Sequence, residues 1–362
     1  MEIFRHTRNV TASDEVSHFF RVSADRPQAL LGACPAYAKT PIVACPALAV
    51  SLGLGSLRVK DESSRMHLGS FKALGGAFAV AQLLKSNIEN KLGQTLNPDD
   101  LTGDQAKSLA RDYTFATASA GNHGLSVAAG AKVFGAQAVI FLSETVPEAF
   151  AMRIRGLGAD VVRVAGSYDA SVNAAIQKAD ANGWQLLADG SWPGYIDPPA
   201  LVMEGYMVLA EECRADFEAN DDWPTHVFLQ AGVGGLAASV SAHIRKTWPQ
   251  QPLITIVEPD AAPCLLYSIK AGALVRADGP DSNMGRLDCK DASLIAFEAL
   301  RWDADVFVTI SDEEAREAAD KFAGYQMPTT PSGAAGLAAI MNRDLGLHEE
   351  SHCLVIVSEG PV

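Results

Sequence analysis

Lys72 is a residue whose type and surroundings together suggest chemistry. It occurs in Gly-Ser-Phe-Lys-Ala-Leu-Gly-Gly-Ala (residues 69–77), and no other Lys, Arg, Asp or Glu lies between Arg65 and Lys85. A charged amine among small and apolar residues is costly unless it is paired or loses its proton. A neutral lysine amine is a nucleophile that forms Schiff bases with carbonyl compounds. The alternative is a lysine whose charged end reaches solvent.

The neighbours of Lys72 predict where it lies in the fold. Leu74, Phe78 and Ala81 follow it at helical spacing, and Ser70 is a suitable N-cap residue. We therefore expect Lys72 in the first turn of an amphipathic helix. The positive end of the helix dipole and burial both disfavour its charged form there, so we expect a neutral amine.

A glycine-rich stretch directly follows the apolar run Thr-His-Val-Phe-Leu-Gln and reads Ala-Gly-Val-Gly-Gly-Leu-Ala (residues 231–237). Gly232, Gly234 and Gly235 allow backbone N–H groups to converge on an anion at the start of a helix. The Gly-Lys-Ser/Thr of nucleoside-triphosphate loops is missing, and a dinucleotide fingerprint belongs at an early strand-to-helix turn. A single phosphate is the expected ligand, and a tight turn without a ligand is the alternative.

A second strand-to-helix turn reads Ser-Ala-Gly-Asn-His-Gly. Ser119, Gly121 and Gly124 bring a hydroxyl and backbone donors to a helix N-terminus, which suits a carboxylate. Asn122 can donate to a further oxygen. His123 is as suitable for packing or capping as for catalysis.

Short apolar runs alternate with helix-length segments from about residue 114 onward, which predicts parallel strands buried on both faces and an α/β fold. The strands are expected at residues 113–119, 137–142, 159–164, 184–189, 225–230, 253–258, 305–310 and 352–358. A Pro/Gly-rich bend at 190–199 is the best domain boundary. Residues 86–110 are polar and rich in turn formers, and we expect them to be a solvated excursion.

The bulk properties are those of an ordinary enzyme with about two domains. The chain has 362 residues and a net charge of -14, which argues against nucleic-acid or anionic membrane partners. Its six cysteines are scattered, so neither a metal site nor a disulfide framework is expected. The N-terminus has no apolar leader and no stretch is long enough to span a membrane, so we expect a cytoplasmic protein.

In this order, the three segments resemble those of the fold-type II pyridoxal-phosphate enzymes, which include the serine/threonine dehydratases and the tryptophan synthase β-subunit. Lys-Asp-Glu and Ser-Phe-Lys in residues 60–72 resemble their lysine segment, Ser-Ala-Gly-Asn-His-Gly their substrate loop, and Gly-Val-Gly-Gly-Leu their phosphate loop. The diaminopropionate ammonia-lyases are the most similar subgroup, because Trp-x-Gly-Tyr and Met-x-Gly-Tyr occur in residues 186–212. The resemblance extends over nearly the whole chain.

The resemblance implies a pyridoxal 5'-phosphate cofactor and assigns residues to it. Lys72 corresponds to the Schiff-base lysine, with Phe71 beside it, and Ser358 to the hydroxyl that faces the pyridine nitrogen. A hydroxyl leaves that nitrogen unprotonated, which suits β-elimination. Five residues correspond to the cup for the cofactor phosphate: Gly232, Val233, Gly234, Gly235 and Leu236.

The resemblance also implies a substrate loop and a base. Asn122 corresponds to the residue at the cofactor's 3-oxygen. Asp189 corresponds to the carboxylate that removes the α-proton of the L-isomer, and its alternative role is to cap the turn after its strand. Freed Lys72 is the other candidate base. Five residues correspond to the loop that grips the substrate carboxylate: Ser119, Ala120, Gly121, Asn122 and His123.

Two departures from the ammonia-lyase pattern concern the substrate. Where the ammonia-lyases have an aspartate that acts on the D-isomer, this chain has Ala120, so we expect turnover of an L-amino acid with little or none of its D-isomer. The segment at 282–293 also differs, because Arg286 and Asp288 add charge. Because of these two departures, the sequence does not decide whether the leaving group is an amine or a hydroxyl.

The sequence therefore predicts two domains, each a mostly parallel sheet flanked by helices, as in the tryptophan synthase β-subunit. Residues 1–76 and 190–362 are expected to form a large cofactor-binding domain, and residues 77–189 a small, mobile substrate-loop domain. The resemblance implies a homodimeric lyase that eliminates a β-substituent from an L-amino acid similar to 2,3-diaminopropionate, giving a 2-oxo acid and ammonia. The alternatives are a serine/threonine- or 3-hydroxyaspartate-type dehydratase and a non-catalytic amino-acid-binding relative.

Overall fold

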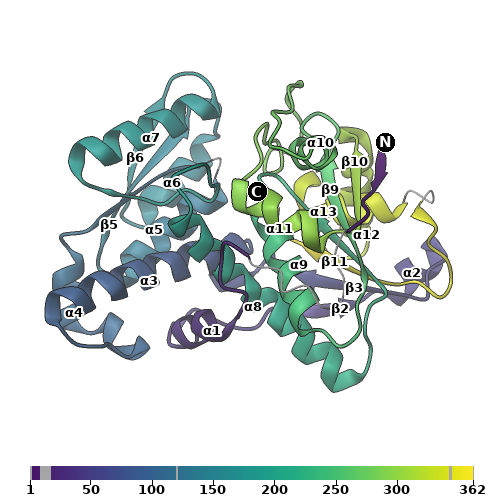
Figure 1. Ribbon diagram of the computed structural model, residues 1–362, viewed down its shortest axis with the longest axis horizontal. Helices are drawn as coiled ribbons and strands as arrows, with labels where there is room; N and C mark the ends of the chain where they lie inside the picture. Colours follow the sequence, from purple (N-terminus) through teal and green to yellow (C-terminus); the bar gives the residue numbers. More distant parts are fainter. Residues whose placement is uncertain (1, 9–17, 120, 342–344, 362) are drawn as a thin grey trace.

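Two sheets in separate lobes form the frame of the protein (Figure 1). The computed structural model describes residues 2–8, 18–119, 121–341 and 345–361. The larger sheet has the order β1 (Ile3–Arg5), β10 (Val306–Ile310), β9 (Leu253–Pro259), β8 (His226–Gln230), β11 (His352–Val357), β3 (Ser56–Asp61) and β2 (Ile42–Ala44). The edge strands β1 and β2 are antiparallel to their neighbours, and the five strands between them are parallel.

The smaller sheet is entirely parallel. Its order is β6 (Asp160–Val164), β5 (Gln137–Ser143), β4 (Thr114–Ala118) and β7 (Gln185–Leu186). All eight strands expected from residue 113 onward are present, and the predicted α/β class with mostly parallel sheets is confirmed. The sequence patterns do not indicate the three N-terminal strands, because β1 and β2 have three residues each and β3 contains a buried charged residue, Lys60.

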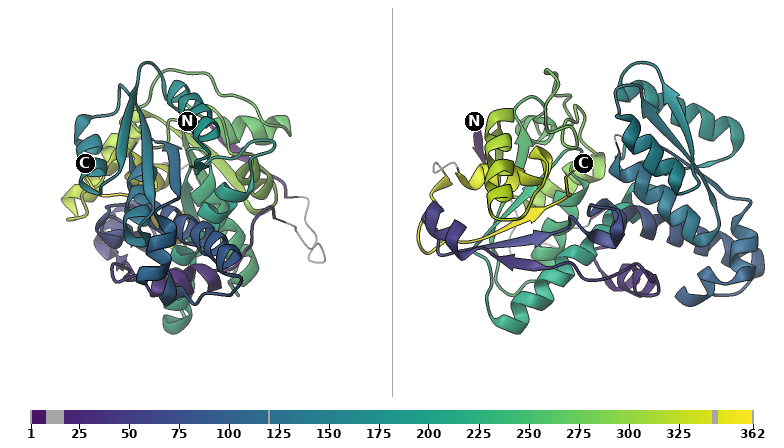
Figure 2. Two further views of the ribbon diagram at one scale, coloured as in Figure 1. Left: turned by 90° about the vertical axis from the view of Figure 1, so that its left-hand side faces the viewer. Right: turned by 180° about the vertical axis from the view of Figure 1, so that it is seen from behind.

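Helices pack on both faces of the larger sheet (Figure 2). Along β8, Val227 and Leu229 belong to the core that includes α9, whereas Phe228 faces the core that includes α13, as the two-residue period of a strand requires. The helices are α1 (Asp25–Gly32), α2 (Pro46–Leu52), η1 (Arg65–His67), α3 (Lys72–Leu92), η2 (Pro98–Thr102), α4 (Asp104–Ala110), α5 (Asn122–Phe134), α6 (Glu148–Gly156), α7 (Tyr168–Asn182), α8 (Asp197–Asn220), α9 (Gly235–Thr247), α10 (Cys264–Ala271), α11 (Leu294–Asp303), α12 (Asp312–Gly324) and α13 (Pro331–Met341).

Helix α3 begins at Lys72, as predicted, but its first half is buried on every side. It packs against α5 and α8, and a Cβ at Gly75 would lie 2.4 Å from the Tyr206 ring of α8. An amphipathic helix is therefore the wrong description of this half, because helices cover it from two directions. Ser70 is not the N-cap. That position is held by Phe71, which makes no side-chain capping bond.

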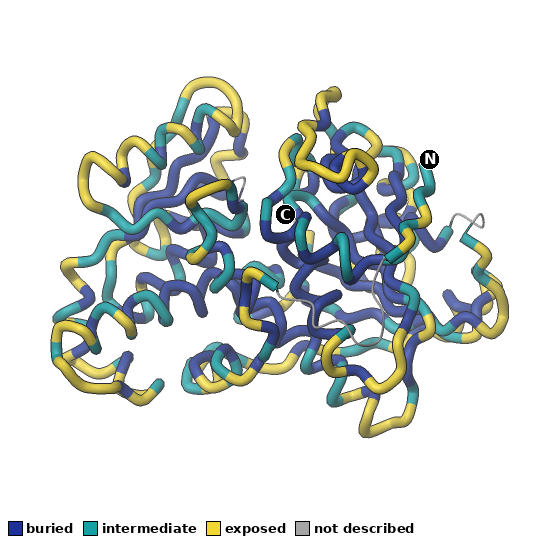
Figure 3. Tube along the Cα trace, viewed as in Figure 1, coloured by how far each residue is buried: buried dark blue, intermediate teal, exposed yellow. Residues whose placement is uncertain are grey.

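Residues 86–110, expected to be a solvated excursion, are exposed over much of their length but are mostly helical and anchored to the core. Helix α3 continues to Leu92, and η2 and α4 follow it. Apolar residues spaced along this polar segment reach the core, which anchors it: Ile88, Leu96, Leu101, Ala106 and Ala110 are buried. Figure 3 shows the buried interior of both lobes and the exposed outer loops.

In the described part of the chain, no helix is long and apolar enough to cross a membrane, and no group of three or more His, Cys, Asp or Glu side chains could hold a metal ion. The six cysteines are free thiols. The predicted domain boundaries at 76/77 and 189/190 stay a prediction.

Candidate active site

Lys72 and Asp189 form a half-buried ion pair at the centre of the candidate site. The Lys72 side chain is 21% exposed and that of Asp189 is 14% exposed. Burial alone would lower the pKa of Lys72, but the Asp189 carboxylate raises it well above its usual value. Burial alone would raise the pKa of Asp189, and the Lys72 ammonium lowers it well below its usual value. Contact with Asp189 thus favours the charged form of Lys72, opposite to the neutral amine expected from burial and the helix dipole alone.

The glycine loop leads directly into α9. Gly234 has φ 100°, a conformation that favours glycine, and it is the N-cap of this helix. The backbone N–H groups of Gly234, Gly235 and Leu236 donate to no described residue. The Val233 carbonyl accepts a hydrogen bond from the Ser293 N–H at 2.9 Å, which fixes the loop. Free N–H groups at a helix N-terminus suit a phosphate.

Tyr206 adds a hydroxyl to this region. Its ring is within 3.7 Å of the Cβ that Gly235 would carry, and its buried hydroxyl has no hydrogen-bond partner among the described residues. The centre of the ring is 5.8 Å from Lys72 Nζ, and Phe71 packs edge-on against it at 4.9 Å. A buried, unpaired hydroxyl beside unpaired N–H groups indicates a polar ligand. Sequence reasoning missed this residue, although it belongs to the Met-x-Gly-Tyr element.

The turn before α5 is held by Ser119. Its Oγ accepts hydrogen bonds from the N–H groups of Gly121 at 2.9 Å and Gly124 at 2.8 Å. Gly121 has φ 144°, and a Cβ there would lie 2.8 Å from the Phe150 ring. Ser119 Oγ accepts both bonds, so its own O–H can still donate to a carboxylate, together with the backbone N–H groups of Asn122 and His123, which donate to no described residue. Ala120, expected in this loop, lies outside the described residues.

His123 packs inside the site as a neutral ring. Its Nε2 lies 2.8 Å from the Leu187 carbonyl and donates to it, and its buried Nδ1 has no partner among the described residues. Burial lowers the pKa of His123. This arrangement favours a positioning role for the side chain.

The end of β11 lies beside the start of α3. The Phe71 N–H donates to the Ser358 carbonyl at 3.1 Å, and Ser70 and Glu359 form an antiparallel bridge. Asn122 donates to the buried Glu359 carboxylate, which the sequence analysis missed. The signal for Glu359 in the sequence is its position as an acidic residue directly after an expected apolar strand. Ser358, Asn122 and the lysine segment are thus brought together.

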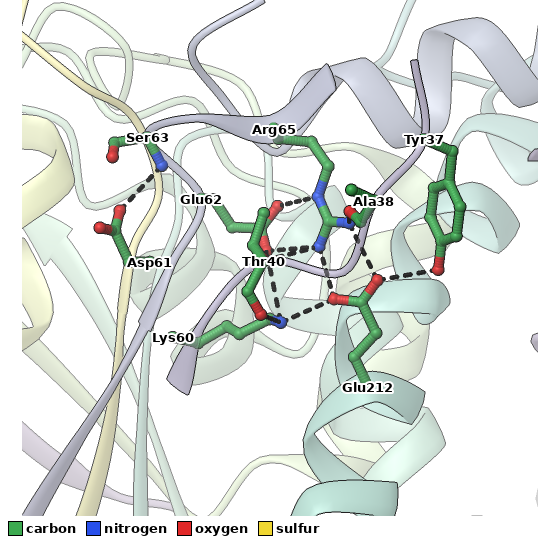
Figure 4. A network of polar contacts seen from close by, with 9 residues as sticks. All are labelled: Tyr37, Ala38, Thr40, Lys60, Asp61, Glu62, Ser63, Arg65 and Glu212. Atoms are coloured by element: carbon green, nitrogen blue, oxygen red, sulfur yellow. Dashed lines mark hydrogen bonds and ion pairs between the residues drawn. The ribbon is translucent and has the colours of Figure 1, made fainter. Parts of the chain in front are cut away.

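A buried ion network holds the segment that leads to Lys72 (Figure 4). Arg65 is fully buried and donates to Glu62 Oε2 and to Glu212 Oε2, each at 2.7 Å. Lys60 Nζ donates to Glu212 at 2.6 Å and to the Thr40 carbonyl at 2.7 Å. These contacts connect β3 and η1 to α8, so they fix the position of the segment that precedes α3.

Comparisons with known proteins agree with this arrangement. The model of a family described as pyridoxal-phosphate dependent enzymes matches residues 33–359. Diaminopropionate ammonia-lyase of Escherichia coli K12 is 33% identical over 343 residues, which are 90% of this chain and 85% of that protein. The protein of the same name from Salmonella typhimurium is 34% identical over 353 residues, with 90% and 86% covered.

Solved structures are similar over the whole chain. A crystal structure of the Escherichia coli diaminopropionate ammonia lyase, in complex with an aminoacrylate-PLP azomethine reaction intermediate, has a TM-score of 0.86 at 30% identity and covers 99% of this chain and 94% of that one. A processed threonine deaminase from Solanum lycopersicum has a TM-score of 0.77 at 21% identity, with 100% and 94% covered. The second similarity concerns the fold alone.

Proposed function

The chain belongs to the pyridoxal-phosphate dependent enzymes, and from this premise we propose that it removes the β-amine of L-2,3-diaminopropionate. It is a lyase of the α,β-eliminating kind, and the proposed products are pyruvate and ammonia. The observation that carries the proposal is the Lys72–Asp189 ion pair, in which an amine and a carboxylate able to act as a base are in contact. The two bacterial ammonia-lyases support the choice of substrate.

The residues of the site fit pyridoxal phosphate. The unpaired N–H groups of Gly234, Gly235 and Leu236 and the Tyr206 hydroxyl would hold its phosphate, Lys72 its aldehyde and Asn122 its 3-oxygen. Ser358 would face its ring nitrogen. When bound, this cofactor withdraws the electron pair that the α-carbon releases. The protein contributes binding, orientation and the handling of protons.

Lys72 and Asp189 are the two groups proposed to handle the α-proton. While Lys72 is charged, the pKa of Asp189 stays low and this carboxylate is a poor proton acceptor. When Lys72 Nζ is neutral, burial raises the pKa of Asp189, and its Oδ2 can accept a proton. A neutral Lys72 Nζ is the other acceptor. With Asp189 as the carboxylate base and Ala120 where the ammonia-lyases have an aspartate, we expect turnover of the L-isomer.

The remaining parts of the proposal concern the assembly. We propose a homodimer in the cytoplasm, since two-fold dimers are the commonest soluble oligomers, and light scattering on the purified protein tests the oligomeric state. We also propose that residues 77–189 move as a small domain relative to residues 1–76 and 190–362. Comparing the solution scattering of the protein with and without substrate tests this motion.

The reaction is tested with purified enzyme loaded with pyridoxal phosphate. Pyruvate and other 2-oxo acids are measured with L-2,3-diaminopropionate, its D-isomer, L-serine, L-threonine and 3-hydroxyaspartate. We expect the highest kcat/KM with an L-2,3-diamino acid. If L-serine or L-threonine is favoured by a wide margin, the enzyme is a dehydratase and the proposed leaving group is wrong.

A further inference from the structure

Arg286 lies in the active site and has no role in the proposed reaction. It belongs to the segment between α10 and α11, and its backbone carbonyl lies 3.1 Å from the Cβ that Gly232 of the phosphate loop would carry. Its guanidinium carbon is 4.6 Å from the centre of the Phe150 ring. Because Phe150 packs against Gly121, the guanidinium lies next to the turn before α5.

The hydrogen-bond donors of this guanidinium are unused within the described part of the chain. Its Nε is buried and has no hydrogen-bond partner there, and the other two nitrogens donate to no described residue. Glu359 Oε2 is 3.6 Å from Nε, too far for a hydrogen bond. The Glu359 carboxylate already accepts from Asn122 and from Thr330 Oγ1. A guanidinium that stacks on an aromatic ring keeps its N–H edges free for a ligand.

The charges around Arg286 indicate the class of that ligand. Lys72 is paired with Asp189, and Lys290 is paired with Asp288 at 2.6 Å, so these cations have partners. A second guanidinium, that of the exposed Arg153, lies 5.6 Å from the centre of the Phe150 ring. Glu359, at 3.6 Å from Arg286 Nε, is the one carboxylate within ion-pair distance of either guanidinium in the described part of the chain, so the two cations favour a further anion. The planar fork of arginine matches a carboxylate best.

The α-carboxylate of the substrate is expected at the N-terminus of α5, where the backbone N–H groups of Asn122 and His123 donate to no described residue. We propose that Arg286 binds a second carboxylate, so that the enzyme prefers 2-amino acids whose β-carbon carries a carboxylate over the same amino acids without one. This inference rests on the proposed function, because it takes the substrate to be an amino acid that reacts at its β-carbon. It makes Arg286 a residue that determines specificity.

Binding of L-aspartate and L-alanine to the holoenzyme tests the proposal. These two amino acids differ only in the second carboxylate and carry no leaving group, so calorimetry measures binding without turnover. We expect L-aspartate to bind about 10-fold or more tighter than L-alanine, as for a hydrogen-bonded charge pair. In Arg286→Gln the preference falls to within about threefold, while Arg286→Lys, which keeps the charge without the fork, retains part of it.

The control is Arg276→Gln, which removes the same charge from the same segment. Arg276 is 44% exposed and is paired with Asp169 and Asp278, each at 3.1 Å. We therefore expect Arg276→Gln to prefer L-aspartate over L-alanine as strongly as the wild type does. The proposal is overturned if the wild type binds L-aspartate and L-alanine with equal affinity. It is also overturned if Arg286→Gln keeps the full preference for L-aspartate. If Arg286→Gln does not fold, an unchanged preference in Arg286→Lys overturns it instead. An equal loss for both ligands in Arg286→Gln also overturns it, because Arg286 then binds the α-carboxylate.

The experiment separates this inference from the proposed function. If L-2,3-diaminopropionate yields no pyruvate but L-aspartate still binds more tightly through Arg286, the proposed reaction is wrong and the inference stands. If pyruvate forms and the preference is absent, the reaction stands and the inference is wrong. A second assay compares kcat/KM for L-3-hydroxyaspartate and L-serine, where we expect Arg286→Gln to raise KM for 3-hydroxyaspartate selectively.

Discussion

Replacing Glu212 by Gln tests how firmly the buried ion network holds the segment that carries Lys72. Glu212 contacts two cations, Lys60 and Arg65, and Glu62 is the other carboxylate of the network. Because Glu62 is 3.9 Å from Lys60 Nζ, Glu212→Gln leaves two buried cations with one carboxylate. Breaking a buried ion pair by removing one partner costs about 3–5 kcal/mol. We therefore expect the free energy of unfolding to fall by that amount, a large part of the total of about 5–15 kcal/mol that proteins have.

The measurement is urea denaturation at neutral pH, with Glu218→Gln as the matched control. Glu218 lies on the same helix, but its side chain is 61% exposed and its pair with Arg214 faces solvent, so its replacement should change the free energy of unfolding by less than about 0.5 kcal/mol. A loss of less than about 1 kcal/mol for Glu212→Gln, or an equal loss in both variants, would refute the reasoning.

The same variant has a predictable pH dependence. Burial alone would raise the pKa of Glu212, but Arg65 and Lys60 lower it below the ordinary value of 4.5. A carboxylate with a lowered pKa in the folded state stabilises the protein above its unfolded pKa, and this contribution is lost as the pH falls through the folded pKa. The wild type should therefore lose stability below about pH 4.5, and Glu212→Gln should lose less over the same interval.

Three further predictions concern the site. Lys72→Ala should abolish pyruvate formation and the visible absorption band that a lysine-bound cofactor gives, and a variant that keeps the band would contradict the role of this amine. Asp189→Asn should lower kcat by about 10²–10⁴-fold if Asp189 is the base, and a wild-type kcat would leave Lys72 as the acceptor. Tyr206→Phe should weaken the binding of pyridoxal phosphate about 10-fold, measured by cofactor titration; unchanged binding would show that the hydroxyl does not face the phosphate.

The sequence predicts those parts of the site that depend on local patterns. The family, the pyridoxal-phosphate cofactor and the lyase class are confirmed by the comparisons. Lys72, residues 232–236 and the turn before α5 all lie in short segments whose glycines and small residues follow a strand or begin a helix. The individual site roles, those of Asp189 and Ser358 among them, stay predictions.

Long-range contacts are what the sequence does not reveal. The pKa of Lys72 depends on Asp189, which lies 117 residues away, so local burial and the helix dipole leave out the contact that favours the charged form. Glu359 and Tyr206 reach the site from a buried strand end and a core helix, and no local pattern there predicts which residues they contact. Strand β3 is missed for a related reason, since its Lys60 is buried where Glu212 compensates the charge.

The bridge between Ser70 and Glu359 has a consequence for how the protein is made. The ribosome synthesises the lysine segment early, whereas the strand beside it, and the carboxylate 237 residues from Asn122, emerge much later. The smaller sheet has all of its strands within residues 114–186, so it can fold while translation continues. The lysine cannot take its final position until β11 has been translated, and nascent chains should become able to bind cofactor only at that stage.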